Sequence, residues 1–190
     1  MASSTSILDE LRSHIASIAP MRTRSAATPT GWAELDQHIG GWPRPGIVSV
    51  HGAVGTGRLG VILPMLRAHT HKQQTVAIVD PMGWIHPPGL PGVDFNHLML
   101  IRCGSVQAGW AAHQVASSGA VPVVVLLDPP SLARDGVRLS RATETGSSTA
   151  IVITERPDPR LSAPVRIQTI GGHRIVIERG APGTPCLSLD

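Results

Sequence analysis

The chain is poor in several residue types that carry particular functions. It has no tyrosine, one phenylalanine, one lysine and two cysteines among its 190 residues. The cysteines, Cys103 and Cys186, can form neither a disulfide framework nor a C-x-x-C metal pair, which favours a reducing compartment. No apolar run reaches the ~18 residues that a membrane-spanning helix needs, and residues 1–6 lack the features of an export signal. We therefore expect a cytoplasmic protein with no membrane association.

The scarcity of aromatic residues also bears on nucleic-acid binding. Base-stacking platforms for single strands are built from aromatic side chains, and Phe95 is the only phenylalanine. The segment from Arg134 to Arg179 has a surplus of positive charge, because it contains eight arginines and five acidic residues. Such a surplus can contact phosphates in a salt-dependent way. DNA binding therefore stays open as an alternative to protein binding.

Two further chemistries are not expected. Nine histidines are present, but His69 and His71 are two residues apart and diverge on a helix, and the others have no partner at a recognised ligand spacing. No Gly-x-Ser-x-Gly nucleophile elbow occurs, and Cys103 has no identifiable base. We expect neither a metal site nor a catalytic triad.

The remaining composition is that of one globular domain, with 42% hydrophobic and 15% charged residues. Strands are expected near 46–51, 75–80, 97–102, 121–127 and 149–154, and helices near 59–70, 105–118 and 132–144. This alternation predicts parallel βαβ units, and the run at 123–127 is apolar on both faces, as in a sheet covered on both sides. Alternating strands around Gly171-Gly172 predict a closing hairpin over 164–179.

Two segments are expected to lie outside this core. Leu8, Leu11 and Ile15 share one face of an amphipathic helix predicted over 6–18, and a Pro-containing linker follows it. At the other end, Gly- and Pro-rich residues predict a flexible tail. The domain prediction is thus 1–30 for helix and linker, 31–179 for the core and 180–190 for the tail. Trp42, Trp84 and Trp110 are expected in the core, and Pro64 is expected to kink the first core helix or delay its start.

A glycine-rich segment, Gly52 to Leu59 (GAVGTGRL), follows the first predicted strand and precedes a predicted helix. Strand, loop and helix in this order are what a phosphate-binding P-loop requires. In such a loop a lysine reaches the β and γ phosphates and a Ser or Thr hydroxyl binds Mg²⁺. The glycines Gly52, Gly55 and Gly57 are in place, but Arg58 stands in the lysine position and Leu59, which cannot bind Mg²⁺, in the hydroxyl position.

Three flanking segments resemble those of one family. They are GWAELDQHIGGWPRPG over 31–46, VAIVDPMGWIHP over 76–87 and VPVVVLLD over 121–128, and they resemble the lead into the core, the second core strand and the Walker B strand of RecA-family recombinases. The resemblance covers roughly 31–185. It implies an α/β fold, namely a single RecA-like P-loop core whose mainly parallel sheet is flanked by helices and closed by a β-hairpin.

The resemblance also implies which ATPase residues are missing. The family carries an acidic catalytic residue two positions beyond the Asp that ends the second strand, and Met82 holds that position here. Asp128 fits the Walker B aspartate. We therefore expect no enzyme activity and no cofactor, while the loop amides leave weak ATP binding open.

Among RecA-like proteins, the sequence resembles the degenerate branch typified by ImuA. That resemblance implies a bacterial, non-catalytic adaptor in SOS-induced translesion synthesis, which binds a Y-family-like ImuB subunit and, through it, an error-prone replicative-type polymerase. Two alternatives stay open. One is a SulA-like inhibitor of cell division that binds FtsZ, and the other is a RecA paralogue that binds DNA, ATP or both.

The candidate binding surfaces lie at the two ends of the chain. The N-terminal helix, through Leu8, Leu11 and Ile15, is the candidate for docking, for binding RecA or for self-association. The basic C-terminal region is the candidate for binding a partner or DNA, through Arg156, Arg160, Arg174 and Arg179.

Overall fold

The computed structural model describes residues 27–130, 132 and 135–189, so the predicted helix with Leu8, Leu11 and Ile15 lies outside the described residues. The strands are β1 (Gly46–His51), β2 (Val76–Val79), β3 (Leu98–Ile101), β4 (Val123–Leu127), β5 (Thr149–Thr154), β6 (Val165–Gly171), β7 (Arg174–Arg179) and β8 (Cys186–Ser188). The α-helices are α2 (Ala33–Ile39), α3 (Arg58–His71), α4 (Ala108–Ser117) and α5 (Asp135–Gly146). Short 3₁₀ turns cover Pro87–Gly89, Phe95–His97 and Ser105–Gln107.

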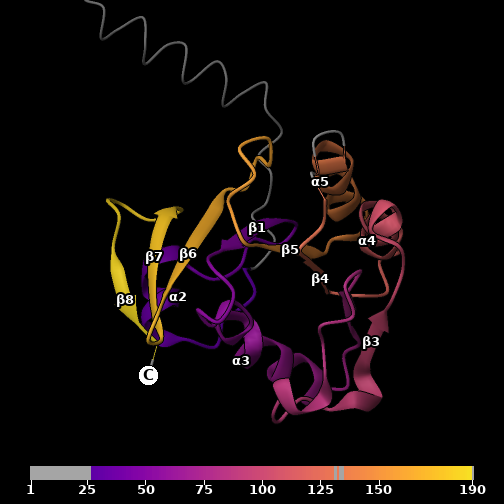
Figure 1. The fold of residues 1–190 in the computed structure, drawn as a ribbon, viewed down its shortest axis with the longest axis horizontal. Coiled ribbons are helices and arrows are strands. Elements are labelled where there is room, and N and C mark those ends of the chain that lie inside the picture. The colour runs from indigo at the N-terminus through magenta and orange to yellow at the C-terminus, as the bar shows by residue number, and fades with distance from the viewer. Residues whose placement is uncertain (1–26, 131, 133–134, 190) are drawn as a thin grey trace, which may run out of the picture.

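All eight strands form one sheet in the order β3-β2-β4-β5-β1-β6-β7-β8 (Figure 1). The first six strands of this order run parallel, β7 pairs antiparallel with β6, and β8 pairs antiparallel with β7. The predicted mixed α/β fold with a mainly parallel sheet and a closing hairpin is confirmed. This architecture is consistent with a RecA-like core.

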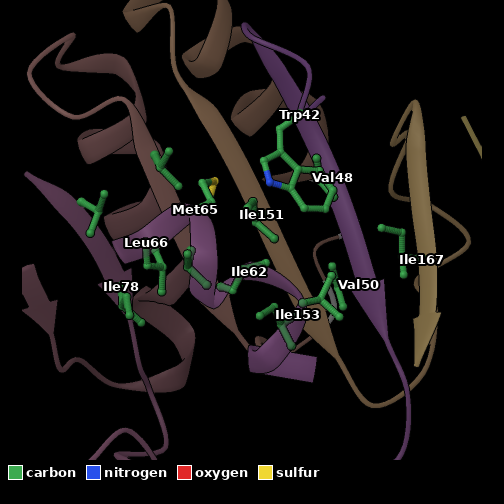
Figure 2. Packing of buried hydrophobic residues seen from close by; sticks show 14 of the residues in the cluster. Trp42, Val48, Val50, Ile62, Met65, Leu66, Ile78, Ile151, Ile153 and Ile167 are labelled. Carbon is green, nitrogen blue, oxygen red and sulfur yellow. The ribbon is translucent and has the colours of Figure 1, made fainter. Parts of the chain in front are cut away.

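The sheet has a hydrophobic cluster on each face. One contains residues of α2 and α3, and the other contains residues of α4 and α5. Figure 2 shows the first, with Ile62 and Met65 of α3 near Ile151 of β5, Leu66 near Ile78 of β2, and Trp42 near Val48 of β1. Successive residues of β1, β4 and β5 point to opposite faces. Both faces are covered, which explains why these strands are nearly continuous apolar runs.

Helix α3 begins at Arg58, directly after Gly57 in a left-handed backbone conformation, and continues past Pro64. The expectation that Pro64 would delay the start of the helix is therefore wrong. Proline has no N–H group, so the carbonyl of Gly60 has no α-helical partner at position 64. Gly60 is exposed, and a Cβ atom built on it meets nothing within 4 Å.

Gly60→Ala is therefore expected to stabilise the protein. Alanine loses less backbone entropy than glycine in a helix, which gives a gain of about 0.5–1 kcal/mol in the free energy of unfolding. Urea unfolding followed by circular dichroism measures it. Gly31→Ala is the opposing control, because its Cβ atom would lie 2.5 Å from the Cβ atom of Pro64 and must destabilise. A loss of stability in Gly60→Ala would contradict the prediction.

The C-terminal segment differs from the predicted flexible tail. Cys186–Ser188 forms β8 and pairs with β7, and Leu189 is buried and donates its N–H to the carbonyl of His173 at 2.7 Å. The prediction of a tail outside the core is wrong for these residues, because the open edge of β7 supplies backbone partners that a local composition rule does not consider. The hairpin turn also shifts by one residue. Its two central residues are Gly172 and His173, both with positive φ.

Only one of the three tryptophans predicted in the core is buried. Trp42 is fully buried, whereas Trp84 is 51% and Trp110 is 64% exposed. Trp84 lies in the turn after β2, and Trp110 lies on α4 between neighbours that face the sheet. The prediction is confirmed for Trp42 and wrong for the other two, because an apolar residue type does not reveal which side of its helix or turn is covered.

His69, near the end of α3, makes stability depend on pH. Burial lowers the pKa of His69 below its ordinary value of 6.5, more than the hydrogen bond with Gln74 raises it. Below pH 6.5 the unfolded chain takes up a proton that the folded protein resists, so stability is lost as pH falls. Unfolding in urea between about pH 7.5 and 5.5 should show a larger loss for the wild type than for His69→Gln. Equal losses would contradict this.

Candidate functional site

The glycine-rich loop and the Walker B-like aspartate lie at the same edge of the sheet. The loop follows β1, and Asp128 follows β4. Since β1, β5 and β4 are neighbours and run parallel, their carboxyl ends meet at this edge, which is where ligands bind in open α/β sheets. The glycine-rich loop and Asp128 therefore lie at the edge of the sheet where a P-loop is expected.

Arg58 and Asp128 form an ion pair at this edge. The Nη1 atom of Arg58 donates to Oδ1 of Asp128 at 2.7 Å, and the two side chains are only 9% and 17% exposed. Arg58 is the first residue of α3, where the helix dipole disfavours a cation. The carboxylate of Asp128 compensates for the unfavourable helix dipole and for the removal of the guanidinium group from water. The two charged positions of the ATPase frame thus bind each other.

The loop itself is attached to β6. Thr56 Oγ1 lies 2.6 Å from Thr169 Oγ1 and donates to the carbonyl of Ala53 at 2.7 Å. Thr169 Oγ1 also reaches the carbonyl of His51 at 3.2 Å. A Cβ atom on Gly52 would lie 2.2 Å from Thr169 Oγ1 and 2.5 Å from the Thr169 carbonyl oxygen. The close approach of loop and strand therefore requires glycine at this position.

The side chains at the other two positions expected to correspond to ATPase residues, Leu59 and Met82, are apolar. Leu59 packs against the hydrophobic cluster under α3, and Met82 is 55% exposed in the turn after β2. Neither side chain offers an oxygen ligand for Mg²⁺. Within residues 27–130, 132 and 135–189, no group of three or more His, Cys, Asp or Glu side chains could hold a metal ion.

The four arginines predicted as a binding surface are all exposed. Arg174 and Arg179 are the first and last residues of β7 and so lie at opposite ends of that strand. Arg156 and Arg160 belong to the segment between β5 and β6, whose end contacts Arg179 through the carbonyl of Ala163 at 3.4 Å. The structure therefore separates Arg174, at the loop edge of the sheet, from Arg179.

Sequence reasoning missed several residues of this region. Thr56 and Thr169 are 113 residues apart, and His51 Nε2 lies 3.0 Å from Glu178 Oε2 across 127 residues. Trp32 was not singled out either, although its indole Nε1 donates to the carbonyl of Val61 at 2.9 Å. No local pattern signals these contacts, because the first two depend on the pairing of β1, β6 and β7 and the third on the packing of the start of α2 against α3.

Comparison with known proteins finds sequence similarity to RecA. Over 109 residues, 55% of this chain, the sequence is 31% identical to protein RecA of Lactobacillus acidophilus. The chain is similar to RecA. RecA proteins of two Lactobacillus delbrueckii subsp. bulgaricus strains are 29% identical over the same length. The matches cover 30–33% of these proteins, so the chain spans about a third of the length of the curated relatives it matches.

The similarity to RecA supports a place in the RecA-like superfamily, together with the sheet order and the position of the loop. No family model matches the chain. None of the helices among the described residues is both long enough and apolar enough to span a bilayer.

Proposed function

We propose that this protein is a RecA-like adaptor that acts by binding and not by ATP hydrolysis. The observation that carries the proposal is the 2.7 Å ion pair between Arg58 and Asp128. In a working site these positions contact the phosphates and Mg²⁺. Here each is already satisfied by the other, and Leu59 and Met82 hold the remaining catalytic positions.

The ion pair also weighs against tight nucleotide binding. Separating the two charges leaves at least one of them poorly compensated in a largely buried site, which costs about 3 kcal/mol. That is more than a hundredfold in affinity. A nucleotide would have to supply this energy without a Mg²⁺ ligand at position 59.

The proposed setting is DNA damage tolerance. The similarity to RecA supports a role connected with DNA damage, and the resemblance to the ImuA branch suggests the finer role of assembling an ImuB-like subunit and an error-prone polymerase in SOS-induced translesion synthesis. Exposed Trp84 and Trp110 are side chains of the kind that anchor protein interfaces. We propose a bacterial cytoplasmic location for this complex.

Calorimetric titration tests the proposal. The purified chain is titrated with Mg²⁺–ATP and, in the same buffer, with the C-terminal region of an ImuB-like protein, with RecA as the positive control for nucleotide. We expect heat from the partner and none from the nucleotide. Nucleotide binding or turnover with a silent partner would overturn the adaptor function.

Two further titrants separate the alternatives. Binding of FtsZ with a silent ImuB fragment would favour an inhibitor of cell division. Binding of single-stranded DNA that weakens steeply with salt would favour a DNA-binding paralogue. If the ImuB-like fragment does not bind, FtsZ binding would overturn the adaptor function in favour of an inhibitor of cell division. Salt-dependent DNA binding would overturn it in favour of a DNA-binding paralogue.

A further inference from the structure

A cavity of about 230 Å³ lies beside the loop, between α3 and the β6–β7 turn. Its floor and walls are largely apolar, and a cationic rim surrounds part of it. The apolar lining residues are Trp32, Val61, Leu63, Pro64, Ile175 and Leu189. An apolar cavity of about 150 Å³ can hold a benzene ring, so there is room here for one leucine- or phenylalanine-sized side chain.

The ionisable residues that line the cavity are all basic. They are Arg67, on α3, and His173 and Arg174, at the β6–β7 turn, and the lining contains no Asp or Glu. Arg67 uses Nε to donate to the carbonyl of Pro91 at 2.6 Å. Among the described residues, neither its terminal nitrogens nor the side chain of Arg174 has an ion-pair partner. The rim therefore complements a ligand that carries several negative charges.

The walls are held in place by contacts within the protein. The hydrogen bond from Trp32 to the Val61 carbonyl orients the indole, and the backbone bond between Leu189 and His173 holds β8 against the turn. Gly60 leaves an opening on the α3 side, since nothing lies within 4 Å of where its Cβ atom would be. A site with this rigidity needs little ordering when it is occupied.

We propose that this cavity docks a short acidic peptide segment of a protein partner. One apolar side chain of the segment fills the cavity, and flanking carboxylates pair with Arg67 and Arg174. The inference rests on the proposed adaptor function and adds the chemical class of the docking segment. A peptide fits better than a free anion because most of the lining is apolar, and apolar burial supplies the binding energy while the charges supply specificity.

The first experiment selects ligands without assuming a partner. A displayed library of random dodecapeptides is panned against the full chain, with the Gly60→Leu variant as the counter-selection. Nothing lies within 4 Å of where the Cβ atom of residue 60 would be, so we expect a leucine there to extend into the opening, block the cavity and leave the fold intact. We expect enriched peptides to combine Asp or Glu with one Leu, Phe, Met or Trp. Enrichment of basic or uncharged peptides, or no enrichment over the variant, overturns the proposal.

The second experiment titrates an enriched, fluorescein-labelled peptide. We expect Gly60→Leu to abolish binding, Arg174→Glu to weaken it more than tenfold, and added salt to weaken it further. Arg141→Glu, which changes an exposed arginine on α5, is the matched control that should stay within about twofold of the wild type. Equal affinity of Arg174→Glu and Arg141→Glu would contradict the assignment of the rim.

The two proposals fail in different ways. If the ImuB-like fragment binds and Gly60→Leu leaves that binding unchanged, the adaptor function stands and the docking site is wrong. If acidic peptides bind in the cavity but the fragment does not, the docking site stands and the partner assignment is wrong. Displacement of the peptide by Mg²⁺–ATP at micromolar concentration would contradict the proposal that the adaptor acts without nucleotide. The proposal that the cavity is a peptide-binding site would still stand.

Discussion

Replacing Arg58 with methionine is expected to lower the free energy of unfolding by about 3 kcal/mol. The variant keeps the apolar part of the side chain and removes only the cation. Asp128 then retains a charge that is only 17% exposed and has lost its ion-pair partner at 2.7 Å. The expected loss is at the lower end of the range for broken buried pairs, because water reaches part of the carboxylate.

Urea unfolding of Arg58→Met, Asp128→Asn and the double variant measures the interaction. The double variant should be more stable than the sum of the two single losses predicts, since neither charge is then left alone. Arg138→Ala is the control, because its contact with Asp135 is 3.7 Å long and the two side chains are 72% and 41% exposed. An exposed pair of this kind contributes at most about 1 kcal/mol.

The outcome also bears on the proposed function. A loss for Arg58→Met no larger than that for Arg138→Ala would mean that the pair contributes little, and a nucleotide could then separate it at low cost. A large loss with strong coupling would make the ion pair a structural substitute for phosphate and Mg²⁺ at this edge of the sheet.

Replacing Gly52 with alanine is the other change with a large expected effect. The added Cβ atom would lie 2.5 Å from the backbone oxygen of Thr169 and 2.8 Å from Thr56 Oγ1. A backbone oxygen in a paired strand cannot move without disturbing β6, so we expect a loss of about 3 kcal/mol, at the upper end for overpacking. The loss is measured by urea unfolding.

Gly55→Ala separates crowding from backbone strain. Gly55 lies in the same loop with φ +85°, but its Cβ atom would meet nothing within 4 Å. Only the left-handed conformation opposes alanine there, at a cost of about 1–2 kcal/mol. If Gly52→Ala cost no more than Gly55→Ala, the close contact between the loop and β6 would be refuted.

Local patterns in the sequence were enough to predict most of the architecture. Apolar runs at 46–51 and 149–154 became β1 and β5 with these bounds, and the strand-loop-helix order around Gly57 placed the start of α3 within one residue. Two local signals gave wrong predictions. Gly and Pro residues before Cys186 favoured a free tail, and the tryptophan residue type favoured burial of Trp84 and Trp110.

The sequence by itself determined the elements, the α/β class and the presence of Arg58 and Leu59 where the P-loop pattern has Lys and Ser or Thr, because these follow from residue type and spacing along the chain. Only the tertiary structure decided what the remaining groups do. Arg58 meets Asp128 across 70 residues, and Thr56 meets Thr169 across 113. Leu189 lines the cavity together with Arg174, because β8 returns to pair with β7. Such contacts depend on strand order and register, which side-chain pattern alone does not encode.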